Sequence, residues 1–120
     1  MDNKRIWEFF EWAQREFEGQ IFPLVAPTMA ILREVILDPL CYLLKEKDIP
    51  FTLQMYSQRL EVGSNTYMGY VASRPEDAYR LYGIRPGGVL VVCVRQISPD
   101  VLEMLEYRCS RVKGSKVWYI

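Results

Sequence analysis

Histidine is absent from all 120 residues of this chain. Histidine is the usual general base near neutral pH, the commonest metal ligand and the partner of most catalytic nucleophiles. Its absence excludes Ser-His-Asp and Cys-His catalysis, HExxH zinc sites and histidine-based pH switches. Any active site would need carboxylate, lysine, tyrosine or cysteine side chains, and we find no complete arrangement of these. The sequence therefore favours a protein that is not an enzyme.

Cysteine is scarce, and the three present (Cys41, Cys93 and Cys109) have no CxxC spacing. Three scattered thiols without an imidazole do not supply the four ligands of a structural zinc ion. Because their number is odd and the N-terminus shows no apolar leader, we expect buried, reduced cysteines in a cytoplasmic protein. The same reasoning predicts no metal and no cofactor.

Long apolar runs are missing, since none reaches the roughly 18 residues that a membrane span needs. The segment most like a membrane span is residues 27–44. It is apolar almost all the way round as a helix, but it contains Arg33, Glu34 and the pair Asp38-Pro39. We predict a helix there that is kinked or restarted at Asp38. It would be buried in the core or shared across a dimer.

Net charge is zero over the whole chain, but residues 1–50 carry −3 and residues 51–120 carry +3. Half of the residues are hydrophobic and a quarter are charged, which is typical of a globular protein. This length predicts one domain, residues 1–120. A charge of +3 on one half is a weak signal for nucleic acid.

Helical periodicity dominates the first half. The spacing predicts a helix over 3–18 with Asp2 as its cap, an apolar connector over 20–26, and the second helix already described. We therefore expect a helical hairpin over 1–50 that covers one face of a sheet.

Strand patterns dominate the second half, residues 51–120. Alternation predicts a strand over 51–62 with a bulge near 57–59, and a return strand over 66–72. A buried strand over 89–94, which we expect at the centre of the sheet, and a final strand over 116–120 flank a helix. The fold class is α+β or α/β in the order α-α-β-β-α-β-α-β, with a mixed sheet of about four strands.

Two serine–arginine pairs follow the predicted strands and form the only candidate ligand site. Ser73 and Arg74 follow strand 66–72, and Arg95 and Ser98 follow strand 89–94. If these strands are parallel, both ends meet at one sheet edge, where helix N-termini and guanidinium groups bind anions. The alternative is that the serines only cap helices and the arginines pair with Glu76, Asp77 or Asp100.

Tryptophan widens the apolar stripe of the first helix, because Trp7 and Trp12 flank the face that carries Phe10. Such a stripe packs into a protein's own core or forms a contact with another protein. Our leading hypothesis is a non-enzymatic protein that self-associates or binds a protein partner through Trp7, Phe10 and Trp12. The alternative is binding of a nucleotide or nucleic acid, through phosphate, at the strand-end edge.

Overall fold

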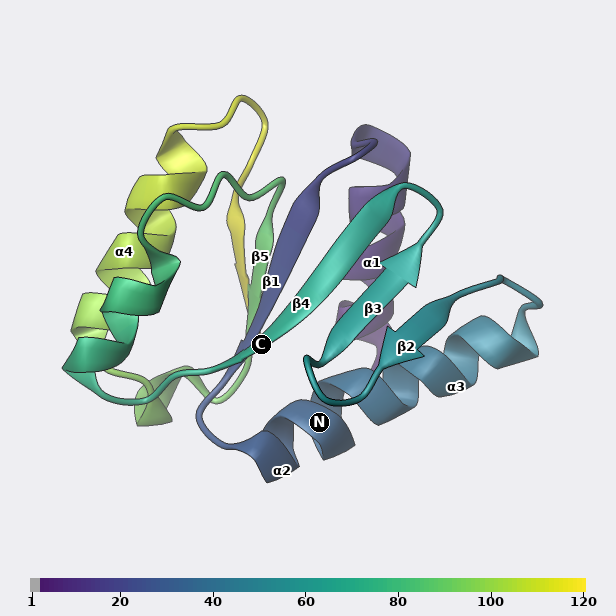
Figure 1. Cartoon of the computed structure of the whole chain (residues 1–120), viewed down its shortest axis with the longest axis horizontal. Coiled ribbons are helices and arrows are strands. Elements are labelled where there is room, and N and C mark those ends of the chain that lie inside the picture. The colour runs from purple at the N-terminus through teal and green to yellow at the C-terminus, as the bar shows by residue number, and fades with distance from the viewer. Residues whose placement is uncertain (1–2) are drawn as a thin grey trace.

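The computed structural model describes residues 3–120, so the predicted cap Asp2 lies outside the described residues. The helices are α1 (Asn3–Glu16), α2 (Met29–Ile31), the π-helical η1 (Leu32–Leu37), α3 (Asp38–Glu46), the 3₁₀ helices η2 (Pro75–Leu81) and η3 (Val94–Gln96), and α4 (Pro99–Ser110). The strands are β1 (Ile21–Ala26), β2 (Thr52–Gln54), β3 (Arg59–Val62), β4 (Asn65–Val71), β5 (Val89–Val91) and β6 (Val117–Tyr119). Figure 1 shows how they are arranged.

One mixed sheet organises the molecule, with its strands in the order β2-β3-β4-β1-β5-β6. Strands β2, β3 and β4 form an antiparallel meander, whereas β1 is parallel to both β4 and β5, and β5 is parallel to β6. The predicted mixed α/β class is confirmed. The sheet has six strands rather than about four.

The largest error of the sequence prediction concerns β1, because residues 20–26 are predicted to be a connector. This strand pairs with β4 along its whole length and also with β5, so it lies at the centre of the sheet, the place predicted for strand 89–94. Pro23 lacks an N–H group and normally argues against an interior strand. Because β1 separates α1 from α2, residues 1–50 are not a helical hairpin.

The other strand beyond the predicted four arises because the segment 51–62, predicted as one bulged strand, forms the two strands β2 and β3. Residues 55–58 form a turn instead, and Gln58 adopts a left-handed backbone with φ of 49°. A turn reverses the chain, so β2 and β3 pair antiparallel with Leu53 opposite Leu60.

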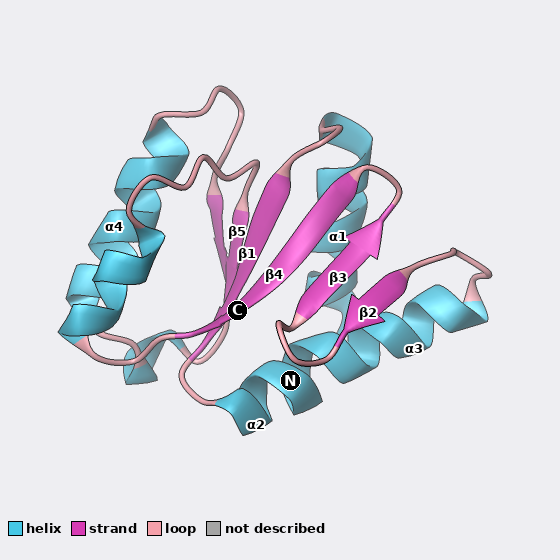
Figure 2. Ribbon diagram, in the orientation of Figure 1, coloured by secondary structure: helices cyan, strands magenta, loops and turns pink. Residues whose placement is uncertain are grey.

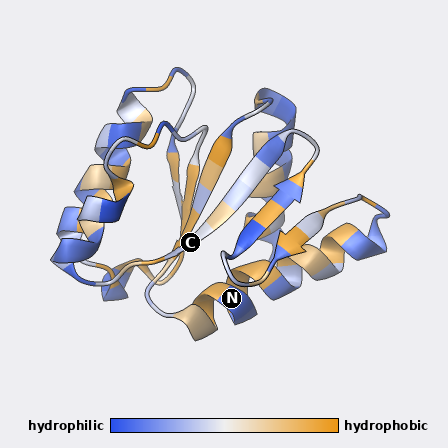
Figure 3. Ribbon diagram, viewed as in Figure 1, coloured by the Kyte–Doolittle hydropathy of each residue, from blue (hydrophilic) through white to orange (hydrophobic). Residues whose placement is uncertain are grey.

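Helices cover both faces of the sheet (Figure 2), and the apolar residues separate accordingly. Phe22 and Leu24 of β1 belong to the core beneath α1, η1 and α3, whereas Val25 belongs to the core beneath η2 and α4. This alternation follows from the two-residue period of a strand. Figure 3 shows the resulting apolar centre of the sheet and the mixed polar and apolar surfaces of the helices.

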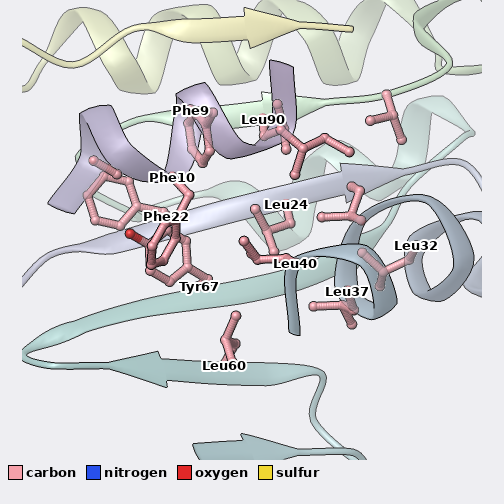
Figure 4. Packing of buried hydrophobic residues seen from close by; sticks show 14 of the residues in the cluster. Phe9, Phe10, Phe22, Leu24, Leu32, Leu37, Leu40, Leu60, Tyr67 and Leu90 are labelled. Atoms are coloured by element: carbon pink, nitrogen blue, oxygen red, sulfur yellow. The ribbon is translucent and has the colours of Figure 1, made fainter. Parts of the chain in front are cut away.

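Aromatic rings join α1 to the sheet (Figure 4). The ring centroids of Phe10 and Tyr67 lie 5.2 Å apart, and Phe22 stacks on Tyr67 at 5.1 Å. Phe9 meets Phe22 edge to face at 6.2 Å. Of the two interpretations of this helix, the structure therefore shows the one in which its apolar stripe packs into the chain's own core.

The helical run 29–46 passes through Asp38-Pro39 without restarting, so of the two predicted outcomes the fresh start with Asp38 as cap does not occur. Asp38 has helical φ and ψ, and its N–H donates to the carbonyl of Arg33, five residues earlier. The wider π turn therefore precedes Pro39, a residue that has no N–H to donate and whose ring crowds an ordinary α turn. Within residues 3–120, no helix is both long and apolar enough to cross a membrane.

Candidate functional site

The carboxyl ends of three parallel strands, β1, β4 and β5, meet at one edge of the sheet. After β1 the chain enters the helices that pack with α1, whereas after β4 and β5 it enters η2 and α4 on the opposite face. The connections thus diverge around the end of β1. In open α/β sheets, ligands bind outside the carboxyl ends of the strands where the connections diverge in this way.

Ser73 and Ser98 lie side by side at this edge. The backbone N–H of Ser98 donates to the carbonyl oxygen of Ser73 at 2.8 Å, which joins the segment after β4 to the segment after β5. The strands are parallel through their shared neighbour β1. The structure therefore brings the two predicted serines together, as the crossover argument requires.

The two serines differ in their capping roles. The Ser98 hydroxyl oxygen accepts from the N–H of Asp100 at 3.2 Å and caps α4, as predicted. Ser73 does not cap η2. Instead a carboxylate oxygen of Asp77 accepts from the N–H groups of Ser73 at 2.9 Å and Arg74 at 3.0 Å. These hydrogen bonds lower the pKa of Asp77, so a negative charge already occupies the donors at the start of η2.

The two predicted arginines are exposed and differ in their partners. Arg74 lies 4.0 Å from Glu76, and both side chains are mostly exposed, so this pair contributes little stability. Arg95 lies on η3 and forms no ion pair with any residue in 3–120. Asp77 pairs with Arg80 at 3.5 Å rather than with Arg74. The Arg95 guanidinium therefore has no carboxylate partner within residues 3–120, and the Arg74 guanidinium is held only weakly.

Thr28 belongs to the same edge, and sequence reasoning missed it. It follows β1 and caps α2, because its hydroxyl oxygen accepts from the N–H of Ile31 at 3.1 Å. The hydroxyl hydrogen remains able to donate. A threonine just after an apolar run could have indicated a cap at the end of a strand. Because residues 20–26 are predicted to be a connector, the sequence analysis does not place Thr28 at the sheet edge.

Cys93 also lies at this edge, beyond β5 rather than inside a buried strand as predicted. Its backbone is left-handed, with φ of 54° and ψ of 51°, and its side chain is half-buried. This conformation is uncommon for a residue other than glycine, asparagine or aspartate. The left-handed turn ends β5 and directs the chain into η3.

The predicted interface residues divide between core and surface. Phe10 is only 3% exposed and packs in the core, so it offers little contact surface. Trp7 and Trp12 are half-buried, and Lys47 and Lys116 stack over their rings, each with 5.3 Å from ammonium nitrogen to ring centroid. The exposed ring surface of α1 therefore comes mainly from the two indoles.

No protein-family model and no curated protein matches this sequence. Solved structures do match in fold. The large terminase from a thermophilic bacteriophage, in complex with ADP, superposes with a TM-score of 0.85 and 22% identity over 95% of this chain. Another crystal form of the same terminase gives a TM-score of 0.83 at 21% identity.

A Thermus phage P74-26 large terminase ATPase domain is more distant, with a TM-score of 0.51 and 16% identity over 94% of this chain. The chain spans 29% of the first terminase and 51% of the second. It therefore has the fold of one part of a large terminase.

Proposed function

We propose that this chain binds a nucleotide through its phosphates at the carboxyl edge of β1, β4 and β5. The observation that carries the proposal is the hydrogen bond between Ser98 and Ser73. It joins two strand ends at the place where the connections of the sheet diverge, and it sets Arg74 and Arg95 on adjoining segments.

Guanidinium side chains supply the charge of the proposed site. Asp77 occupies the backbone donors at the start of η2, so a phosphate would be held by Arg74 and Arg95 rather than by that helix end. Arginine suits this role because its planar donors match phosphate oxygens. Thr28, at the end of the strand between them, adds a hydroxyl donor.

The comparisons support the class of ligand. The bacteriophage terminase was solved with ADP and, in another crystal, with ATP-γ-S, at TM-scores of 0.85 and 0.79 to this chain. The residues of the proposed site are identified from the geometry of this chain.

Hydrolysis is not part of the proposal. The 120 residues contain no G-x-x-x-x-G-K-[ST] motif, which cradles phosphates in P-loop NTPases. Those enzymes also use a carboxylate to hold magnesium, whereas the residues that follow β5 here are Val92, Cys93 and Val94. The residues present fit binding rather than catalysis.

Isothermal titration with ADP tests this proposal, comparing the wild-type chain with the double variant Arg74→Glu/Arg95→Glu. We expect the variant to lose at least about tenfold in affinity, and wild-type binding to weaken as salt rises. Arg111→Glu/Lys113→Glu is the matched control, because it makes the same charge change beyond the far end of α4. Equal ADP affinity in wild type and both variants, or no binding by wild type, would refute the proposal.

A second candidate function is self-association through α1. Trp7 borders a surface hollow of about 450 Å³ that also includes Phe10, Glu11, Arg15 and Ile49. Indole rings are enriched at the centres of protein interfaces. If this surface forms a dimer, sedimentation velocity will show wild-type dimers that dissociate in Trp7→Ala and persist in Tyr56→Ala, which removes an exposed ring elsewhere. A wild-type monomer would exclude this function.

A further inference from the structure

A surface hollow lies between η2 and α4, and it is lined by tyrosine. It measures about 600 Å³. Tyr79 and Tyr82 come from η2 and the residue after it, and Tyr107 comes from α4. Their exposed fractions are 70%, 57% and 53%, so three large rings stand open to solvent. We call this hollow the tyrosine groove.

Carboxylates supply the charge of the tyrosine groove. Glu76, Asp100 and Glu103 line it, and no lysine or arginine of the described chain does. Glu76 has a loose pair with Arg74 at 4.0 Å, whereas Asp100 and Glu103 form no ion pair within residues 3–120. The groove therefore combines aromatic faces with negative charge, although it lies in the half of the chain whose net charge is positive.

Two tyrosine rings already receive guanidinium groups from within the chain, and one of these groups belongs to Arg111, whose Cζ lies 5.9 Å from the ring centroid of Tyr107. The Cζ atom of Arg108 lies 5.6 Å from the ring centroid of Tyr82 and 5.5 Å from that of Tyr107. Cations bind over aromatic faces at such distances by attraction to the ring quadrupole. Tyr79 has no such cation from the described part of the chain, and its ring lies 5.8 Å from that of Tyr82.

We propose that the tyrosine groove docks an arginine- or lysine-bearing segment of a partner protein. A cationic side chain would stack on Tyr79, as Arg108 stacks on its neighbours, while Asp100 and Glu103 accept its hydrogen bonds. This arrangement of rings and carboxylates complements a positively charged segment in chemistry and in sign of charge. The occupant is a protein segment because the groove exceeds the volume of one side chain.

The tyrosine groove borders the proposed nucleotide edge, since Glu76 of the groove pairs with Arg74 at 4.0 Å, but its charge is opposite. A nucleotide phosphate would be repelled by Glu76, Asp100 and Glu103, whereas it is attracted by Arg74 and Arg95. The two proposals therefore involve ligands of opposite charge, and either can fail without the other.

Fluorescence anisotropy with a labelled tetra-arginine peptide tests the docking proposal. We expect Tyr79→Ala and Glu103→Lys each to weaken binding by about tenfold, and Tyr79→Phe to retain it because the ring remains. Tyr56→Ala and Glu34→Lys are matched controls that change an exposed tyrosine and an exposed glutamate outside the groove. Both should bind the peptide as wild type does.

Three results would overturn the docking proposal. The first is the absence of peptide binding by the wild-type chain. The second is equal weakening by Glu34→Lys and Glu103→Lys, which would show only general charge attraction. The third is a change of oligomeric state in Tyr79→Ala or Glu103→Lys by sedimentation velocity, which would identify the occupant as a second copy of this chain.

Discussion

Gly88 lies against the indole of Trp12 so closely that a Cβ atom there would be 2.5 Å from Cζ3 of the ring. Gly88 is buried just before β5, and Trp12 belongs to α1. The glycine is thus a packing requirement between helix and sheet, in agreement with the absence of a phosphate loop from the sequence. The close approach of α1 to the sheet therefore requires a residue without a Cβ atom at position 88.

Gly88→Ala should destabilise the protein by about 1–3 kcal/mol, because overpacking forces the indole or the backbone to move. Urea unfolding followed by circular dichroism measures the loss. In the double variant with Trp12→Leu, the loss should be smaller than the sum of the two single losses, because a smaller side chain makes room. Additive losses would show that the contact with Trp12 is not the cause.

Asn65 is buried at 3% exposure and joins β4 to α1 and the chain after it. Its amide donates to Gln14 Oε1 and to the carbonyl of Phe17, both at 3.0 Å, and it accepts from the N–H of Gln20 at 3.0 Å. Asn65→Ala leaves the carbonyl of Phe17 and the N–H of Gln20 without this partner, while Gln14 Oε1 still accepts from the Tyr67 hydroxyl, and it should cost about 2–3 kcal/mol. The exposed Gln54→Ala is the control, and an equal shift of its urea midpoint would contradict the assignment.

Asp77 should make stability depend on pH. Its folded pKa is lowered, so its stabilising contribution is complete above the unfolded pKa of about 4 and is lost as pH falls through the folded pKa. Asp77→Asn should therefore be less stable than wild type by about 1 kcal/mol near neutral pH, through loss of the cap. The gap should close in strongly acidic solution.

Urea midpoints measured from about pH 7 down to about pH 2.5 follow this difference. Glu34→Gln, on an exposed carboxylate outside η2, is the control. A gap for Asp77→Asn that stays constant with pH would show that the carboxylate is not the cap.

Replacement of Cys93 by glycine should not lower the stability of the protein. Its φ of 54° is left-handed, and glycine adopts that region without the cost of about 1 kcal/mol that a Cβ atom imposes. Cys93→Gly should therefore match or exceed wild type in thermal stability, whereas Cys93→Val should lower it, because branched residues fit this region poorly. Equal stability of the glycine and valine variants would contradict the backbone argument.

Local patterns identify much of the framework. The apolar run 27–44 is largely helical, the predicted return strand 66–72 corresponds to β4, and Ser98 caps α4 as its sequence predicts. These features depend on a few neighbouring residues, so periodicity and capping chemistry reveal them. The sequence could predict which residues of the candidate site follow strands. Because parallel strands place their carboxyl ends at one edge, these residues could be expected to share that edge.

Sequence reasoning fails where two local signals conflict or where a distant partner decides the outcome. Pro23 argues against a strand, yet β1 pairs on both sides. Its neighbours β4 and β5 come from 45 residues or more downstream, so no local pattern around Pro23 reveals them. Ser73 has the sequence of a cap, but Asp77 takes the N–H groups because a carboxylate is the stronger acceptor.

The sequence by itself determined the class of the fold, the absence of histidine chemistry and the positions of serine and arginine residues just after two strands. Composition and periodicity carry this information because each depends on residue type and near neighbours. Only the tertiary structure decided that Phe10 is core, that β1 separates the helices and that three tyrosines line an acidic groove. Those facts depend on which elements pack against one another. The burial of a residue is therefore decided by contacts with parts of the chain that are distant in sequence.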